Sequence, residues 1–197
     1  MPALLARVAR GRFCRWPCRY LRSLRRHGRA HRRSALTASV VLRLGLGIGV
    51  LVALLDQGAK SWVLATVMQP PRVIEVTSFF NLVLGWNRGV SFGLLNDADG
   101  VGPWPFLALT AAITLGLGFW LYRVSGRWLG VALGLIIGGA VGNAADRVRF
   151  GAVVDFLDFH LAGLHWPAFN LADSAISVGV VMILVDSLFG HSRSPTI

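Results

Sequence analysis

Four long apolar segments, separated by polar stretches, dominate the hydropathy pattern of this 197-residue chain. A helix needs about 20 consecutive, mostly apolar residues to cross a bilayer. Segments that meet this length lie at about residues 42–66, 103–122, 128–146 and 172–189. The second carries no charge, and the fourth is interrupted only near its ends, by Asp173 and Asp186. The pattern predicts a mainly α-helical membrane protein with four transmembrane helices.

The segment between the first two helices has a different character. Pro70 and Pro71 end the first helix, because proline lacks the amide hydrogen that a helix interior needs. Residues 70–98 then mix β-branched and aromatic side chains, with a turn signal at Asn87-Arg88-Gly89. These features predict a small β-rich subdomain between helices 1 and 2, with roughly two to four short strands that lie on the membrane surface.

The third apolar segment contains Gly134, Gly138 and Gly142 at four-residue spacing. Small residues repeated at this interval lie on one face of a helix and let two helix backbones approach closely. We therefore expect this face to pack against a neighbouring helix. The glycines of residues 45–49 lie inside the first apolar segment without a preceding strand, so we expect no nucleotide-binding loop there.

The composition agrees with a membrane protein and distinguishes a basic N-terminal arm. The chain is 54% hydrophobic, with a mean hydropathy of +0.60 and a net charge of +11. Twelve arginines lie between Arg7 and Arg43, and no acidic residue precedes Asp56. From residue 44 onward, eight basic and nine acidic residues nearly cancel. The positive charge therefore belongs to residues 1–40, which we expect to form a disordered cytoplasmic arm.

Anionic lipid is the partner that we expect for this arm, because polybasic segments beside a membrane helix are attracted to it. Nucleic-acid binding is a weaker alternative, and we expect no nucleic-acid partner. A translation start placed too far upstream would also explain the arm. Cys14 and Cys18 lie within it, and without other ligands nearby, two incidental thiols explain this pair better than a metal site does.

The charge distribution also predicts the orientation in the membrane, since Lys and Arg are enriched in cytoplasmic loops. The arm, the short loop between helices 2 and 3, and the tail at residues 191–197 are basic. In the loops 67–102 and 146–173, acidic residues outnumber basic ones. We therefore expect both termini in the cytoplasm and both acidic loops, with the β-rich subdomain, on the extracytoplasmic side.

Polar side chains lie at the predicted extracytoplasmic ends of three helices. Residues spaced i, i+3 and i+4 share one face of a helix. The residues with this spacing are Asp56 and Lys60 on the first helix, Asn143, Asp146 and Arg147 on the third, and Asn170 and Asp173 on the fourth. Asp155 lies on the segment between the last two helices. Ionisable groups at this depth are costly unless they face a polar interior, so we expect them to converge on one site.

Each of these residues also has a purely structural interpretation. Asp173 can cap the fourth helix, where a carboxylate meets the positive end of the helix dipole. The spacing of Asp56 and Lys60 favours a structural ion pair, and Asp146 with the two arginines that follow it can orient the loop. Asp158 is expected to be solvated or interfacial. These interpretations need a separate reason for each residue, whereas one polar site accounts for them together.

Paired carboxylates suggest a particular chemistry. Two of them in a poorly solvated site cannot both ionise cheaply, so one pKa rises and the pair shares a proton. Such a pair supplies a base that activates water and an acid that protonates a leaving amine, as in aspartic proteases. His160 and His165 lack the partners of a zinc site, and Ser174 has no triad partners in the sequence. We therefore expect no metal or cofactor.

Four blocks of the sequence resemble the bacterial lipoprotein signal peptidase family, also called signal peptidase II. The blocks are DQGAK at 56–60, NRGVSFGLL at 87–95, GGAVGNAADRVRFGAVVDFLDF at 138–159 and WPAFNLADSAI at 166–176. They occur in the family's order, and the third and fourth are the specific ones. Val90 and Ser91 stand where alanines are common in the family, a difference that concerns substrate preference rather than activity.

The resemblance implies an intramembrane aspartyl protease of the bacterial inner membrane, with one catalytic domain at residues 41–190 and its active site on the extracytoplasmic side. Its substrates would be prolipoproteins, cleaved just before a diacylglyceryl-modified cysteine, and globomycin-type inhibitors would occupy the same cleft. The family's catalytic aspartates match Asp155 and Asp173. Its supporting polar residues match Asp56, Lys60, Asn143, Asp146, Arg147 and Asn170, with Asn87 in a loop expected to contact substrate.

Two other classes of protein remain as alternatives. A proton- or ion-coupled transporter would place its carboxylates near mid-bilayer and often shows repeated halves, whereas the sequence has them at one predicted face and shows no internal repeat. A membrane scaffold built on glycine-lined helices would tolerate alanine at Asp155 and Asp173. The sequence favours the protease over both.

Overall fold

A computed structural model describes the backbone of residues 16–89 and 103–189, with side chains from residue 38 onward in these ranges. Three predictions therefore fall at least partly outside the described residues. They concern the N-terminal arm with its cysteine pair, the β-rich loop beyond residue 89 with Val90 and Ser91, and the tail at residues 191–197.

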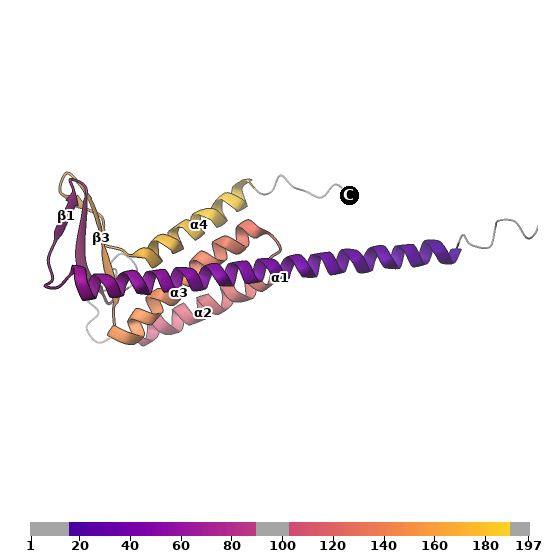
Figure 1. Ribbon diagram of the computed structural model, residues 1–197, viewed down its shortest axis with the longest axis horizontal. Coiled ribbons are helices and arrows are strands. Elements are labelled where there is room, and N and C mark those ends of the chain that lie inside the picture. The colour runs from indigo at the N-terminus through magenta and orange to yellow at the C-terminus, as the bar shows by residue number, and fades with distance from the viewer. Residues whose placement is uncertain (1–15, 90–102, 190–197) are drawn as a thin grey trace, which may run out of the picture.

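Four helices form a bundle (Figure 1). They are α1 (Trp16–Trp62), which continues into a π-helical turn (Val63–Val67), α2 (Trp104–Arg123), α3 (Arg127–Phe150) and α4 (Leu171–Phe189). Within the described residues, all four contain spans that are long and apolar enough to cross a membrane, and the span in α1 begins at Ala38. The prediction of four transmembrane helices is confirmed.

Helix α1 begins earlier than the sequence predicts. The apolar pattern places its start near residue 42 and predicts disorder over residues 1–40, whereas the backbone is helical from Trp16 onward. Figure 1 shows this part of α1 continuing straight out of the bundle. Hydrophobic patterning misses such a segment because arginine has good helix propensity but contributes nothing to an apolar signal.

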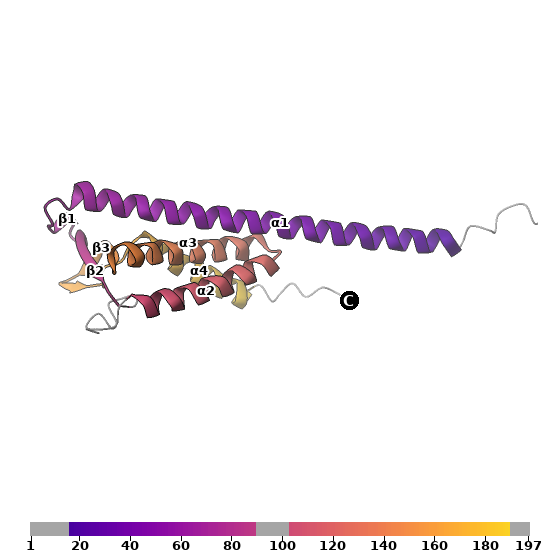
Figure 2. The ribbon, with the colours of Figure 1, turned by 90° about the horizontal axis from the view of Figure 1, so that it is seen from below.

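A four-stranded antiparallel sheet lies at the opposite end of the bundle from this extension (Figures 1 and 2). Its strands, in spatial order, are β1 (Ile74–Thr77), β2 (Phe80–Asn87), β3 (Val153–Leu161) and β4 (Leu164–His165). The β-rich subdomain is thus confirmed, but it is not confined to the α1–α2 connection. The α3–α4 connection supplies β3, and Gly85 lies opposite Asp155. Pairing between such distant segments leaves no signal in a local sequence window.

Helix α3 is the central helix of the bundle. Half of its apolar window is buried, compared with 6% of the window in α2. The predicted glycine face packs against α1: a Cβ at Gly138 would lie 2.5 Å from the carbonyl oxygen of Gly49, and one at Gly142 would lie 2.6 Å from Oδ2 of Asp56. This close approach brings the polar end of α1 against the polar end of α3.

Replacing Gly138 with alanine tests this packing. We expect Gly138→Ala to lower the unfolding temperature in detergent, because overpacking a close contact costs about 1–3 kcal/mol. Gly116→Ala in α2 is the matched control, since a Cβ there would meet nothing within 4 Å. That variant should be neutral or slightly stabilised, because alanine is the better helix former. Equal unfolding temperatures for the two variants would contradict the packing argument.

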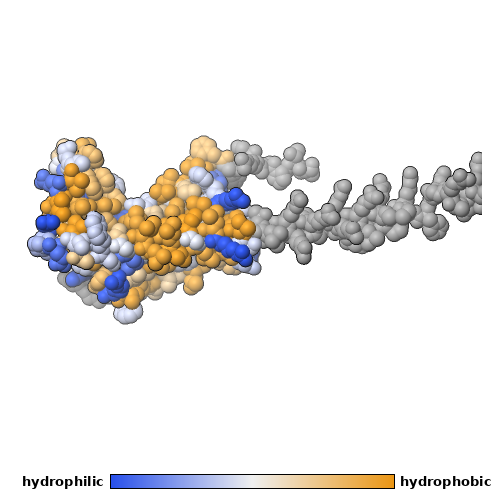
Figure 3. Space-filling model, in the orientation of Figure 1, coloured by the Kyte–Doolittle hydropathy of each residue, from blue (hydrophilic) through white to orange (hydrophobic). Residues whose placement is uncertain are grey.

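The surface of the bundle matches a lipid environment. Figure 3 shows apolar residues over the middle of the helices and polar residues gathered near both ends. Large apolar side chains are exposed on each helix, among them Leu54, Leu115, Val148 and Leu188. Exposed apolar surface on this scale would be unfavourable in water, so the helices are suited to contact with lipid tails.

Candidate active site

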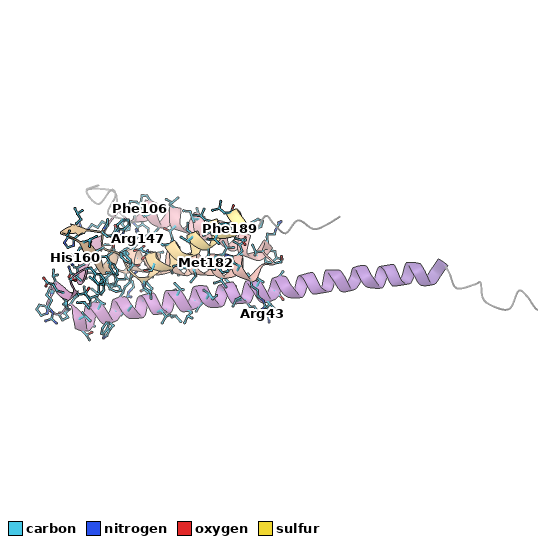
Figure 4. All side chains as sticks on the ribbon, turned by 90° about the horizontal axis from the view of Figure 1, so that it is seen from above. Arg43, Phe106, Arg147, His160, Met182 and Phe189 are labelled. Atoms are coloured by element: carbon cyan, nitrogen blue, oxygen red, sulfur yellow. The ribbon has the colours of Figure 1, made fainter. Side chains whose placement is uncertain are left out.

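The polar residues picked out from the sequence converge at the end of the bundle that carries the sheet. In Figure 4, Arg147 lies close to Phe106 at this end, whereas Arg43 and Phe189 lie toward the other. The buried polar residues include Asp56, Lys60, Asn143, Asp146, Arg147, Asp155 and Asn170. Asp173 and Asn87 complete the group through hydrogen bonds to its members.

Asn170 contacts both candidate catalytic carboxylates. Its Nδ2 donates to Oδ1 of Asp155 at 2.7 Å, and its backbone N–H donates to Oδ2 of Asp173 at 3.3 Å. In return, the Asp173 N–H donates to Oδ1 of Asn170 at 2.9 Å. This reciprocal pair is a capping box at the start of α4. The structural interpretation of Asp173 as a first-turn capping residue therefore holds, and the same cap brings it to Asp155.

Asn143 connects Asp173 to Asn170 and to Lys60. Its Nδ2 donates to Oδ1 of Asp173 at 2.9 Å, while its Oδ1 accepts from Nδ2 of Asn170 at 3.2 Å. Oδ1 of Asn143 also accepts from Nζ of Lys60 at 2.9 Å. The amide orientations of Asn143 and Asn170 are fixed by these partners, so both asparagines present donors to the carboxylates.

Asp155 lies in β3 and is 3% exposed. Oδ2 accepts from Nδ2 of Asn87 at 3.2 Å, which joins the ends of β2 and β3 at the site. Burial, reinforced by the negative charge of Asp173, raises the pKa of Asp155 to about 7, although the hydrogen bonds from Asn87 and Asn170 act in the opposite direction. A carboxyl group in this state holds a proton far more readily than one in water.

Lys60 forms a buried triad with two acids. Nζ lies 2.8 Å from Oδ2 of Asp56 and 2.8 Å from Oδ2 of Asp146. Oδ1 of Asp56 accepts the backbone N–H of Ala172 at the start of α4, and Oδ2 of Asp146 accepts that of Val154 in β3. The predicted ion pair of Asp56 and Lys60 is present, and Asp146 pairs with Lys60 rather than with the arginines that follow it. The triad holds α1, α3, α4 and β3 together.

Arg147 joins the site to the segment that follows β2. Nη2 donates to the carbonyl of Gly89 at 2.8 Å, and the guanidinium lies 5.7 Å from the ring centre of Phe106. Its Nε is buried and has no hydrogen-bond partner among the described residues. The turn signal at Asn87 is also present, since Oδ1 of Asn87 accepts the Gly89 N–H at 3.1 Å.

One feature of this end of the molecule, Gln57, is absent from the predictions, and a second, Asp158, differs from the solvated or interfacial position predicted for it. Gln57 bridges α1 and α3 through three hydrogen bonds, and its sequence signals are a polar residue inside an apolar span and its place in the DQGAK block. Asp158 is buried rather than solvated, because Nδ2 of Asn81 donates to it at 3.1 Å and Nδ1 of His165 lies 2.9 Å from it. These partners come from neighbouring strands, so local patterns do not reveal them.

Known proteins share both the sequence and the fold of this chain. A model of the family described as "Signal peptidase (SPase) II" matches residues 48–189. The chain is 49% identical over 152 residues to a lipoprotein signal peptidase of Burkholderia multivorans, covering 77% of this chain and 91% of the relative. It is 45% identical over 152 residues to that of Methylobacterium radiotolerans, covering 77% and 89%.

Two solved structures, both described as a bacterial membrane enzyme, resemble the fold. One has a TM-score of 0.67 and 31% identity, covering 78% of this chain and 93% of the other. The second has a TM-score of 0.63 and 33% identity, covering 74% and 92%. Together with the sequence matches, these similarities show that the chain belongs to the signal peptidase II family, the bacterial lipoprotein signal peptidases.

Proposed function

We propose that the chain is an aspartyl endopeptidase whose Asp155 and Asp173 act on one water molecule to cleave prolipoproteins just before the diacylglyceryl-modified cysteine. Family membership itself makes it a bacterial membrane protein that removes signal peptides from prolipoproteins. The observation that carries the catalytic assignment is the position of Asn170, which donates to both carboxylates at once.

The two carboxylates have different environments, which suggests different roles. Asp155 has a pKa raised to about 7 and holds the shared proton at rest. Asp173 lies in the first turn of α4 and accepts hydrogen bonds from Asn143 and Asn170, and these hydrogen bonds favour the ionised form of its carboxylate. Asp173 is therefore the general base and Asp155 the general acid.

Hydrolysis then needs no metal and no covalent intermediate. Asp173 accepts a proton from water as the water oxygen attacks the scissile carbonyl carbon, and Asp155 donates its proton to the carbonyl oxygen. As the carbon–nitrogen bond breaks, Asp173 passes its proton to the leaving amine of the cysteine, and Asp155 recovers its own. Arg147, whose Nε has no partner among the described residues, donates to a carbonyl oxygen of the substrate.

The orientation of the protein in the membrane determines from which side the substrate reaches this site. The excess of arginine in the arm and in the α2–α3 connection puts those parts in the cytoplasm, so the sheet and the active site lie on the extracytoplasmic side of the inner membrane. The acyl chains of the substrate lie in the bilayer against the helices, and the peptide lies under the sheet. Globomycin-type inhibitors compete with the substrate for this site, and the N-terminal arm contacts anionic lipid.

Activity should decrease as the pH rises above about 7. The singly protonated pair is the active form, and Asp155 loses the shared proton as the pH passes its pKa of about 7. Two ionised carboxylates leave no acid for the carbonyl oxygen, so kcat should decline about tenfold per pH unit on the alkaline side. Initial rates on a diacylated substrate between pH 5 and 9 would measure this. A rate that increases from pH 7 to pH 9 would contradict the assignment.

Cleavage of a defined substrate tests the function directly. Purified protein should convert a diacylated prolipoprotein into a product whose mass is lower by that of the signal peptide, and globomycin should block the conversion. An unmodified prolipoprotein that lacks the diacylglyceryl group is the matched control and should remain intact. Lack of cleavage, or cleavage at another peptide bond, would refute the proposal.

A further inference from the structure

Gln57 occupies a central place between α1 and α3, although it is not among the predicted site residues. Its Nε2 donates to Oδ1 of Asp146 at 2.7 Å and to the carbonyl of Gly142 at 3.1 Å, with a longer contact of 3.4 Å to Oδ2 of Asp56. One amide nitrogen thus contacts the two acids that flank Lys60.

The orientation of this amide is set from the opposite side. Oε1 of Gln57 accepts from Nη1 of Arg149 at 3.1 Å. A flipped amide would turn its oxygen toward the Asp146 carboxylate and its NH₂ group toward the Arg149 guanidinium, so both contacts would become repulsive. Arg149 itself is exposed and lies over the ring of Phe150, with 4.8 Å from its Cζ to the ring centre. An exposed arginine therefore fixes which way a half-buried glutamine points.

A chain of hydrogen bonds connects Gln57 to β3, the strand that carries Asp155. Oδ1 of Asp146 is held by Gln57, and Oδ2 accepts the backbone N–H of Val154 at 3.1 Å. Val154 immediately precedes Asp155, and its carbonyl accepts from Nδ2 of Asn170 at 3.2 Å. Rotation of the Asp146 carboxylate would therefore move the backbone on which Asp155 is carried. Gln57 prevents that rotation because it occupies the oxygen that Lys60 and Val154 leave free.

From these contacts we infer that Gln57, locked by Arg149, is a positioning residue that orients Asp146 and thereby sets the position of Asp155 relative to Asp173. This inference rests on the proposed function. Gln57 contacts neither carboxylate of the pair, so its removal affects the geometry of the reaction and leaves substrate binding intact. Misplacement of a reacting group by about 1 Å can cost on the order of a hundredfold in rate.

Kinetics of four variants test the inference. Gln57→Met keeps the length of the side chain but removes both hydrogen-bonding groups, and we expect a loss of roughly tenfold to hundredfold in kcat with KM within about twofold. Gln57→Glu should lose more, because it places a carboxylate against Asp146. Arg149→Met should show a smaller loss, and Arg149→Lys should restore part of it. Gln69→Met is the matched control, since Gln69 is exposed and, among the residues that the structure describes, donates only to the carbonyl of Leu64.

Rates are taken per folded enzyme on a diacylated prolipoprotein, alongside unfolding temperatures. The inference is refuted if Gln57→Met has the wild-type kcat, whether or not its unfolding temperature is lower. It is also refuted if the variant changes KM and leaves kcat unchanged. If Gln57→Glu is as active as the wild type, the glutamine merely fills space. Should Gln57→Met fail to fold, Arg149→Met gives the same readout at an exposed site. In each case the proposed function stands if the wild-type protein cleaves the substrate and Asp155→Asn does not. If the wild-type protein is inactive, both the proposed function and this inference are refuted.

Discussion

Replacing Asp155 or Asp173 with asparagine should abolish cleavage while leaving a folded protein in the membrane. Each change removes one partner of the proton-sharing pair, and loss of a positioned acid or base costs about 10²–10⁴ in rate. The fold should survive because the side-chain oxygen of asparagine can still accept the hydrogen bond that Asn170 donates to Asp155 or to Asp173. Cleavage of a diacylated prolipoprotein by the purified variants, with unfolding temperatures measured in parallel, gives the result.

The chain offers a matched control for each variant. Asp158 lies three residues after Asp155 in the same strand, but it is bonded to Asn81 and His165 instead of the site. Asp186 lies in the same helix as Asp173 and is exposed. Asp158→Asn and Asp186→Asn should retain most of the activity per folded enzyme. Near-normal processing by Asp155→Asn or Asp173→Asn would remove the basis of the proposed mechanism.

Replacing Lys60 with methionine should cause the largest loss of stability. The Lys60 side chain is 2% exposed and neutralises Asp56 and Asp146, each 2.8 Å from Nζ. Without it, two carboxylates remain buried with no cation, and breaking a buried ion pair in this way costs about 3–5 kcal/mol. The unfolding temperature in detergent and the yield of monodisperse protein would measure the effect.

Two further variants separate this electrostatic cause from a loss of packing. Arg43→Met removes an exposed cation from the same helix and should change stability by no more than about 0.5 kcal/mol. Lys60→Met combined with Asp146→Asn removes one of the two unpaired charges and should be less destabilised than Lys60→Met alone. If Lys60→Met unfolds at the wild-type temperature, the triad does not hold the helices as described.

The transmembrane helices could be predicted from the sequence because crossing a bilayer imposes a length and an apolar composition on each segment. The predicted ends of α2, α3 and α4 lie within a few residues of those observed, apart from the last turn of α3, which extends to Phe150. The start of α1 could not be predicted in the same way, since helix formation upstream of residue 42 leaves no apolar signal. Likewise, β3 forms through pairing with β2, a segment far away in the chain.

Local spacing also placed most polar residues of the site on the correct helix ends. The i, i+4 pair Asp56 and Lys60 is present, and the glycine spacing of α3 correctly indicated a close helix contact. The partners of Asp146 were not predictable, because its ion pair with Lys60 depends on the packing of α1 against α3. Gln57 was missed for the same reason.

What the sequence alone determined is which segments cross the membrane, which residues are polar within them, and which family motifs the chain carries. These are properties of short windows, where periodicity and composition report directly on local structure. Only the tertiary structure decided that Asn170 bonds Asp155 and Asp173 together, that Lys60 neutralises acids from two helices, and that Gln57 holds Asp146. Those contacts join distant segments, and their geometry exists only once the helices and the sheet have packed.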